Sequence, residues 1–248
     1  MKAWFVSDIH LRDINERNSV ILLRFLHSLL KDSETTHLFL LGDIFDLWVG
    51  DSDVFQAKFQ TLVDAIVDVK KMGVEVVYFE GNHDVHVKGF WENKFSIPVW
   101  ADAKSYQLGS WKVRLEHGDF INPHDEKYLK YREFIRRPAL EKLAYIIPGK
   151  LLDEVGIAAS KLSRKKSSVR RRDSEQQLRQ MIRDYAVAKF REEKFDLMIT
   201  GHMHIRDDHE FESQGSKGRS INLGSWFEDP QALCLTDNKY TWIDLQKI

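Results

Sequence analysis

The first 80 residues alternate short apolar runs with longer segments of helical period. The short runs, rich in β-branched and aromatic residues, are KAWFVS, HLFLLG and VEVVYFE, and they are separated by RNSVILLRFLHSLLKD and VFQAKFQTLVDAIVDVKKMG. Apolar residues of the second long segment recur every three or four positions, which is typical of a helix with one buried face. This order implies parallel strands joined by crossover helices. We therefore expect an α/β fold in which the strands end at one edge of a sheet, where functional residues gather.

Later runs predict hairpins and a second sheet. Strand character recurs in SYQLGSWKVRLEHGD, DLMITGHMH, SINLGSW, ALCLTD and KYTWIDLQ, with turns at LGSW and DNK. Between the first of these strands and the rest, the chain has almost wholly helical character. We expect a single domain over residues 1–248, with a helical insertion at about residues 125–194.

Charge and cysteine content exclude several classes of protein. The chain carries 37 basic and 38 acidic residues, so it has no overall attraction for a polyanion. The stretch from Lys127 to Lys194 is basic, however, with 19 basic and 9 acidic residues. The single cysteine, Cys234, excludes an intrachain disulfide and a cysteine-based metal cluster. The apolar run at the N-terminus is too short for a signal peptide, so we expect a cytoplasmic protein.

Polar residues follow five of the predicted strands. The segments are SDIH, GDIFD, GNHD, HGD and GHMH, and together they hold half of the ten histidines. One aspartate after a strand is usually a helix N-cap. Burying so many polar groups along one edge would instead cost several kcal/mol each, unless they are paired or bound to metal. The sequence therefore predicts a metal site at this edge.

The ligand types narrow the choice of metal. Imidazole nitrogens with carboxylate and amide oxygens, and without thiolates, suit manganese, iron or zinc. The ligands are too many for one tetrahedral ion, and they fit two ions about 3.5–4 Å apart bridged by a carboxylate, as in phosphate-ester hydrolases. We expect two divalent ions, with manganese favoured over iron and zinc.

The motifs D-x-H, G-D-x-x-D, G-N-H-D, H-G-D and G-H-x-H resemble, in order and spacing, those of the calcineurin-like metallophosphoesterases from Val6 to Ser225. The resemblance implies a four-layer α/β/β/α sandwich. It also implies seven metal ligands, which are Asp8, His10 and His204 on one ion, Asn82, His117 and His202 on the other, and Asp43 bridging both.

The same resemblance implies catalytic roles within GNHD. His83 would face the substrate as an acid or as a cationic stabiliser of the transferring phosphoryl group, and Asp84 would orient His83. Water would attack phosphorus in line with the leaving oxygen, without a covalent enzyme intermediate.

Three further features resemble the UDP-2,3-diacylglucosamine pyrophosphatases of lipid A synthesis. They are GDIFDLWVGDSD, an HGD followed by D-x-x-Y-x-x-Y-R, and the helical insertion before GHMH. The resemblance implies release of UMP and 2,3-diacylglucosamine 1-phosphate. It implies substrate contacts from Asn82, Trp48, Asp125, Tyr128, Arg132, Lys165 and Lys166.

In that family the insertion is a lid that holds acyl chains. Here its apolar residues include Leu140, Leu143, Ile147, Leu151, Val155 and Leu162, which are equally suited to the packing of the lid itself. The basic run RKKSSVRRR, Arg164 to Arg172, would meet the diphosphate and the anionic inner-membrane surface, at roughly 1 kcal/mol per basic residue near that surface. Peripheral attachment to the membrane would follow.

Two departures from the subfamily keep other functions open. His83 stands where its members usually have arginine, and GHMHIRDD replaces their GHTH-R-P. The alternatives are a phosphodiesterase for soluble nucleotides, a nuclease gripping nucleic acid through RKKSSVRRR, and a non-catalytic scaffold. The nuclease is disfavoured because that run lacks aromatic residues, and intact ligands disfavour the scaffold. For Trp226 and Phe227, packing is favoured over lining the pocket.

Overall fold

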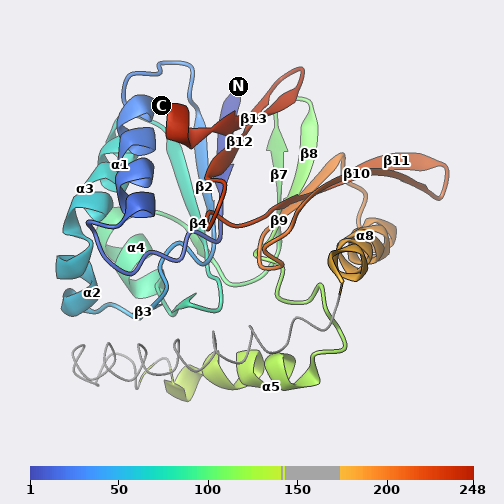
Figure 1. The fold of residues 1–248 in the computed structure, drawn as a ribbon, viewed down its shortest axis with the longest axis horizontal. Coiled ribbons are helices and arrows are strands. Elements are labelled where there is room, and N and C mark those ends of the chain that lie inside the picture. Colours follow the sequence, from blue (N-terminus) through green and yellow to red (C-terminus); the bar gives the residue numbers. More distant parts are fainter. Residues whose placement is uncertain (141, 143–173) are drawn as a thin grey trace.

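The computed structural model describes residues 1–140, 142 and 174–248 (Figure 1). Within these ranges, helices, a first sheet, a second sheet and a further helix follow one another as layers, so the expected α/β/β/α architecture is confirmed. The predicted insertion is described at its two ends only, in α5 (Glu126–Ile135) and α8 (Glu175–Glu192). The predictions for Lys165, Lys166, the run RKKSSVRRR and the apolar residues from Leu143 to Leu162 lie outside the described residues.

The first sheet holds six strands in the described chain, in the order β13–β12–β1–β2–β4–β6. These are β1 (Lys2–Val6), β2 (His37–Leu41), β4 (Glu75–Phe79), β6 (Val99–Trp100), β12 (Gln231–Thr236) and β13 (Tyr240–Asp244). β1, β2 and β4 are parallel, as the sequence predicts, and β6 pairs parallel with β4. The carboxyl ends of β1, β2 and β4 therefore reach the same edge. β12 pairs antiparallel with β1, and β13 pairs antiparallel with β12, so the runs ALCLTD and KYTWIDLQ, expected in hairpins and a second sheet, form a hairpin that extends the first sheet.

Helices cover the outer face of this sheet. They are α1 (Arg17–Leu29), α2 (Asp53–Lys58), α3 (Gln60–Lys71) and α4 (Lys88–Phe95). The second predicted helical segment is divided into α2 and α3 at Phe59, whose φ of −117° and ψ of 21° leave the helical range. Gly73, with a φ of +91°, follows the last turn of α3, so the predicted helix end is confirmed.

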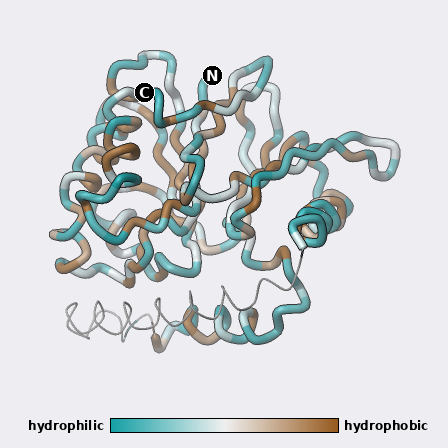
Figure 2. Tube along the Cα trace, in the orientation of Figure 1, coloured by the Kyte–Doolittle hydropathy of each residue, from teal (hydrophilic) through white to brown (hydrophobic). Residues whose placement is uncertain are grey.

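The second sheet has the order β10–β11–β9–β8–β7 among the residues described. Its strands are β7 (Lys104–Leu108), β8 (Trp111–Leu115), β9 (Leu197–Thr200), β10 (Arg206–Ser213) and β11 (Ser216–Leu223). The two sheets pack face to face through Phe5, Phe39, Leu115 and Ile199. Figure 2 shows apolar residues along the strands where the layers meet. Strands covered on both faces become apolar throughout, which explains the continuous runs in the sequence.

The fourth layer is α8, which packs on the outer face of the second sheet. Its Phe190 contacts Phe195 and Phe211 with ring centroids 5.2 Å away in each case. Gly218 of β11 leaves room for this ring, because a Cβ there would lie 2.8 Å from Phe190 Cε2. In the described ranges, no helix combines the length and the apolar character needed to cross a bilayer.

Phe190→Ala should destabilise the fold, because it leaves a cavity beneath α8. We expect a loss of about 3–5 kcal/mol in the free energy of unfolding, measured by urea titration, and a smaller loss for Phe190→Leu. A Phe190→Ala protein as stable as the wild type would contradict the packing of α8 described here.

Candidate metal centre

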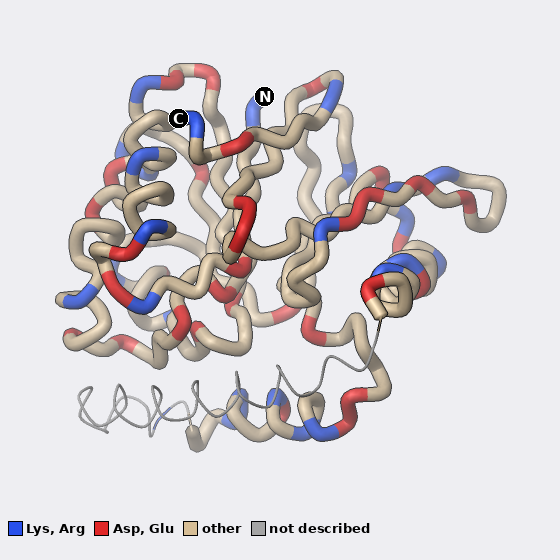
Figure 3. Tube along the Cα trace, viewed as in Figure 1, with Lys and Arg blue, Asp and Glu red and all other residues tan. Residues whose placement is uncertain are grey.

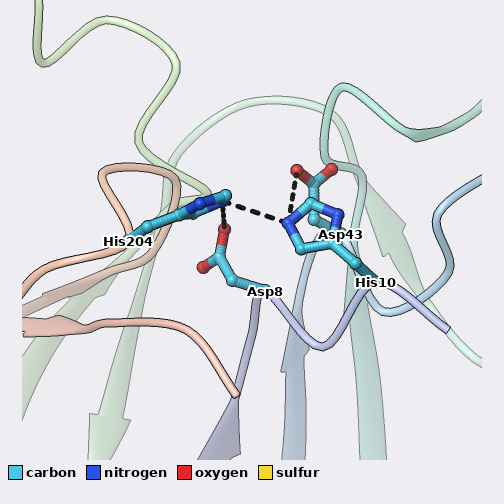
Figure 4. A group of neighbouring side chains, drawn as sticks. All are labelled: Asp8, His10, Asp43 and His204. Atoms are coloured by element: carbon cyan, nitrogen blue, oxygen red, sulfur yellow. Dashed lines mark hydrogen bonds and ion pairs between the residues drawn. The ribbon is translucent and has the colours of Figure 1, made fainter. Parts of the chain in front are cut away.

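The polar segments that follow five strands meet at one edge of the molecule. Asp8 and His10 follow β1, Asp43 follows β2, Asn82 follows β4, His117 follows β8, and His202 and His204 follow β9. Ligand atoms of Asp8, His10, Asp43 and His204 lie within 4.8 Å of one another and form the first cluster (Figure 4). Those of His117, Asp119 and His202 form the second cluster, within the same limit. The expected convergence of distant segments is therefore present.

The Asp43 carboxylate lies between the two clusters. Its Oδ2 is 3.8 Å from His10 Nε2 and 3.5 Å from His117 Nε2. Its Oδ1 accepts the backbone N–H groups of Asn82, at 2.8 Å, and of His83, at 2.9 Å. One oxygen thus holds the GNHD loop while the other faces both clusters. This position fits a carboxylate that bridges two ions.

The first cluster brings two imidazoles against a buried carboxylate. His204 Nε2 lies 3.0 Å from His10 Nε2 and 3.3 Å from Asp8 Oδ1. Burial lowers the pKa of His10 to about 4, so its ring is neutral and offers a lone pair. The Asp8 carboxylate is held by Ser7 Oγ, at 2.6 Å, and by the backbone N–H of His202. Neutral imidazole and ionised carboxylate are the forms in which these groups bind divalent metals.

The second cluster contains a buried nitrogen that fits a metal ligand. His117 Nδ1 donates to the Leu41 carbonyl at 2.8 Å, and a bond of this kind commonly orients a ligating imidazole. His117 Nε2 is buried and finds no hydrogen-bond partner among the described residues. Its nearest charged neighbour is Asp43 Oδ2, 3.5 Å away, and a metal ion between the two would engage both atoms. Asn82 Oδ1 lies 3.1 Å from His202 Nδ1, which adds an amide oxygen to the donor set.

The charges of the site also fit bound cations. Asp8 and Asp43 are 0% and 1% exposed, and buried carboxylates need compensating positive charge. Although burial opposes it, the Asp43 carboxylate raises the pKa of His117 well above its usual value, which makes that ring the compensating cation. Divalent ions would supply this charge instead and would displace the proton. The donor set and its charge together fit divalent metal binding.

Backbone strain concentrates at the same residues. Of the eight non-glycine residues with positive φ in the described ranges, five are Asp8, His10, Asp43, His202 and His204, at φ between 51° and 67°. Aspartate and histidine tolerate this left-handed region better than most residues, yet each such residue costs about 1–3 kcal/mol. Strain of this kind persists where a site demands it, and here it falls on the ligand-type residues.

The structure corrects the expected role of Asp84. Its carboxylate accepts the backbone N–H groups of Asp43, Ile44 and Gly81 and the Tyr78 hydroxyl, at 2.6–3.0 Å. His83 is held instead by its own Nδ1, which donates to the Asp46 carbonyl at 2.8 Å. Asp84 therefore positions the loop that follows β2 and does not orient His83. The reason is that three backbone donors and a hydroxyl surround it in the interior.

The prediction that Trp48 contacts the substrate is wrong. Its side chain is 0% exposed and packs among Phe45, Phe59 and Phe90, while its Nε1 donates to the Gly50 carbonyl at 3.0 Å. The backbone around it does support the site, because β3 (Trp48–Val49) pairs with β5 (Asp84–Val85) and joins the GDIFD and GNHD loops.

Two of the three residues predicted on the helix after HGD, Tyr128 and Arg132, contact the second cluster. Asp125 caps α5 and accepts the Tyr128 N–H at 3.1 Å. The Tyr128 hydroxyl and the Arg132 Nε both donate to Asp119, the latter at 2.7 Å. The Tyr128 ring centroid is 5.0 Å from that of His202. Tyr128 and Arg132 thus tie α5 to the HGD loop.

Sequence reasoning missed three residues that shape the site. Asp119 belongs to the HGD motif and Asp46 to the GDIFD motif, so the position of each motif after a strand could have identified both residues. Arg136 had no such signal, since it belongs to the helical insertion. Its Nη1 donates to Glu80 Oε2 at 2.6 Å and its Nη2 to the Gly81 carbonyl at 2.9 Å, which ties α5 to the GNHD loop.

A two-sheet α/β/β/α fold with ligand clusters at the strand ends is an arrangement that suits a metal-dependent phosphoesterase. The chain belongs to the calcineurin-like phosphoesterase family, whose sequence model matches residues 1–206. It is therefore a metal-dependent hydrolase that binds divalent metal.

The chain is similar to curated proteins over nearly its whole length. The UDP-2,3-diacylglucosamine hydrolase of Photorhabdus laumondii is 27% identical, over 96% of this chain and 96% of that protein. The protein of the same name from Vibrio atlanticus is 25% identical, over 97% of this chain and 96% of its own. Among solved structures, a novel archaeal phosphodiesterase covers 98% of this chain and 99% of its own at a TM-score of 0.48 and 14% identity, a likeness too slight to support an argument.

Gly81→Ala should weaken metal binding, because its Cβ would lie 2.1 Å from Asp43 Oδ1 and 2.5 Å from Asp43 N. We expect manganese affinity, measured by calorimetric titration, to fall at least about tenfold as the bridging carboxylate is displaced. Gly73→Ala is the control for glycine replacement away from the site, since nothing lies within 4 Å of its Cβ. Its φ of +91° makes alanine destabilising there, but the metal affinity of the folded protein should stay at the wild-type value. Equal affinity in the Gly81→Ala protein would show that Asp43 does not hold metal.

Proposed function

We propose that the chain hydrolyses the diphosphate of UDP-2,3-diacylglucosamine to UMP and 2,3-diacylglucosamine 1-phosphate. The observation that carries the proposal is the nearly full-length likeness to UDP-2,3-diacylglucosamine hydrolases, at 25–28% identity, in a chain whose ligand clusters are complete. The proposal treats residues 1–248 as one domain with the helical insertion as its lid.

Two groups of residues would hold the metal ions. Asp8, His10 and His204 would hold one, Asn82, His117 and His202 the other, and Asp43 would bridge them. Bound there, two divalent ions supply charge neutralisation for the diphosphate and activation of water. Manganese is favoured because the donors are nitrogen and oxygen without thiolate, and iron and zinc accept the same donors.

His83 would act on the leaving group, although its ring also lies within 4.8 Å of ligand atoms of His10 and Asp46. Its backbone N–H donates to Asp43 and its Nδ1 to the Asp46 carbonyl, so both ends of the residue are fixed while Nε2 remains for the substrate. Its ring meets that of His10 edge-on at 4.9 Å, beside the first cluster. A protonated His83 would donate from Nε2 to the leaving oxygen or stabilise phosphoryl charge.

The α5 side of the site suits a lipid. Phe120, Tyr131 and Phe134 are 43%, 52% and 49% exposed and offer apolar surface for acyl chains. Asp125, Tyr128 and Arg132, at the start of α5 and on it, would contact the substrate from this side. Lys165 and Lys166 remain predictions for the diphosphate, outside the described residues.

The same side suits a membrane surface. Lys127, Lys130 and Arg137 are exposed on and after α5, and Figure 3 shows basic residues along this helix. Each would contribute roughly 1 kcal/mol near an anionic leaflet. The proposal therefore places the enzyme in the cytoplasm, bound peripherally to the inner membrane.

Replacing a proposed ligand and replacing His83 should have different effects. Asp43→Ala and Asn82→Ala should abolish hydrolysis and sharply reduce bound metal, because each removes a ligand. His83→Ala should lower kcat by about 10²–10⁴ while metal content, measured by mass spectrometry, is kept. Equal metal loss in all three proteins would make His83 a ligand and overturn its proposed role.

The substrate is tested by release of UMP from UDP-2,3-diacylglucosamine by the manganese-loaded protein. Selective turnover is expected, with UDP-N-acetylglucosamine and a nitrophenyl phosphodiester hydrolysed far more slowly, because only the acylated sugar engages the apolar surface at α5. Equal or better turnover of the soluble esters would instead identify a phosphodiesterase for soluble substrates, which the histidine at position 83 favours.

A further inference from the structure

We propose that Phe227 binds the nucleobase of the substrate by stacking, so that the nucleoside lies over the first cluster and the lipid over the second. The inference rests on the proposed function for its substrate, and it assigns a role to a residue outside all of the metal motifs.

Phe227 is turned toward solvent by the residue before it. Trp226 is 1% exposed, its Nε1 donates to the Gln231 carbonyl at 3.0 Å, and its backbone N–H donates to the Asp8 carbonyl at 3.2 Å. Its own carbonyl accepts Asn18 Nδ2 at 3.1 Å. This confirms packing for Trp226. The same contacts hold the backbone at Trp226 against Asp8, and the next residue, Phe227, is 55% exposed.

The Phe227 ring lies against the first cluster. Its plane is 13° from that of His10 at a centroid distance of 5.3 Å, which is a stacked contact. His204 meets the same ring at 5.5 Å and 74°, edge-on. One face of the phenyl ring therefore covers His10. Because the residue is 55% exposed, ring surface remains that His10 does not cover and that a ligand can reach.

Exposed aromatic side chains are confined to the surroundings of the site. Within the described ranges they are Phe120, Tyr131, Phe134 and Phe227. The first three lie on or next to α5, whose Tyr128 borders His202 of the second cluster. Phe227 borders His10 and His204 of the first cluster. Aromatic surfaces thus flank the two ligand clusters on two sides. A diphosphate that carries a nucleoside at one end and a lipid at the other could contact one surface with each end.

The α5 surface and the Phe227 surface differ in shape. This difference assigns the lipid to the first surface and the nucleoside to the second. The α5 side offers several separate apolar side chains, which suit flexible acyl chains. The Phe227 side offers one flat ring beside the phosphate-binding residues, which suits a planar base joined to phosphate through one ribose. Stacking of a base on an aromatic ring changes affinity by roughly 5- to 160-fold.

The test compares binding of UMP and of ribose 5-phosphate, which keeps the sugar and the phosphate and has a hydroxyl group in place of the base. Titration calorimetry on the full manganese-loaded chain should show that UMP binds about tenfold more tightly than ribose 5-phosphate. In Phe227→Ala and Phe227→Leu this ratio should fall close to one while ribose 5-phosphate affinity is kept, because leucine preserves apolar contact with His10 but offers no flat face. Phe227→Trp should keep the ratio.

Met72→Ala serves as the matched control, since Met72 is 63% exposed at the end of α3 and its truncation should leave both affinities unchanged. Two results would overturn the inference. One is a preference for UMP over ribose 5-phosphate that is the same in Phe227→Ala as in the wild type. This includes the case in which neither protein prefers UMP. The other is an equal loss of both affinities, which would mean that Phe227 only supports His10 and His204.

These outcomes are separate from those of the substrate test. A protein that leaves UDP-2,3-diacylglucosamine intact but loses its UMP preference in Phe227→Ala would refute the lipid substrate and retain the base-binding role. A protein that hydrolyses the lipid with an unchanged ratio would refute the role of Phe227 alone.

Discussion

The Asp43 carboxylate is the constraint on which the rest of the site depends. It is buried at the end of β2, where an unpaired charge would be costly, so both of its oxygens must be engaged. One oxygen holds the backbone of Asn82 and His83, and the other faces His10 and His117. The loops after β1, β2, β4 and β8 are thereby arranged around a single group, in a position that fits a carboxylate bridging two divalent ions.

The fold around this group tolerates considerable local strain. Left-handed backbone at Asp8, His10, Asp43, His202 and His204 would weaken a small domain by several kcal/mol in total. The central strands offset this cost, because β1, β2 and β4 are buried on both faces between two layers. The rigid two-sheet core therefore holds ligand-type side chains in orientations that an isolated loop would not keep.

The helix α5 is held to the site by polar contacts. It has no buried residues among those described, and it is anchored where Tyr128 and Arg132 bind Asp119 and where Arg136 binds the Gly81 carbonyl. A helix held this way keeps its apolar side chains on the surface. This explains how the enzyme can present an apolar face next to a highly charged centre, as hydrolysis of a lipid-linked diphosphate would require.

The four-layer architecture and the proposed ligand set are implied by the resemblance of the five motifs. The sequence by itself determined the α/β class of the fold and the edge of the sheet at which polar residues gather. The fold class and this edge follow from local rules. Continuous apolar runs indicate buried parallel strands, and the carboxyl ends of such strands lie at one edge of the sheet. Only the tertiary structure decided that Trp48 is buried, that Asp84 holds backbone N–H groups, that Asp119 anchors α5, and that Phe227 faces solvent. Each of these depends on which distant segments surround a side chain, and spacing along the chain carries no record of that.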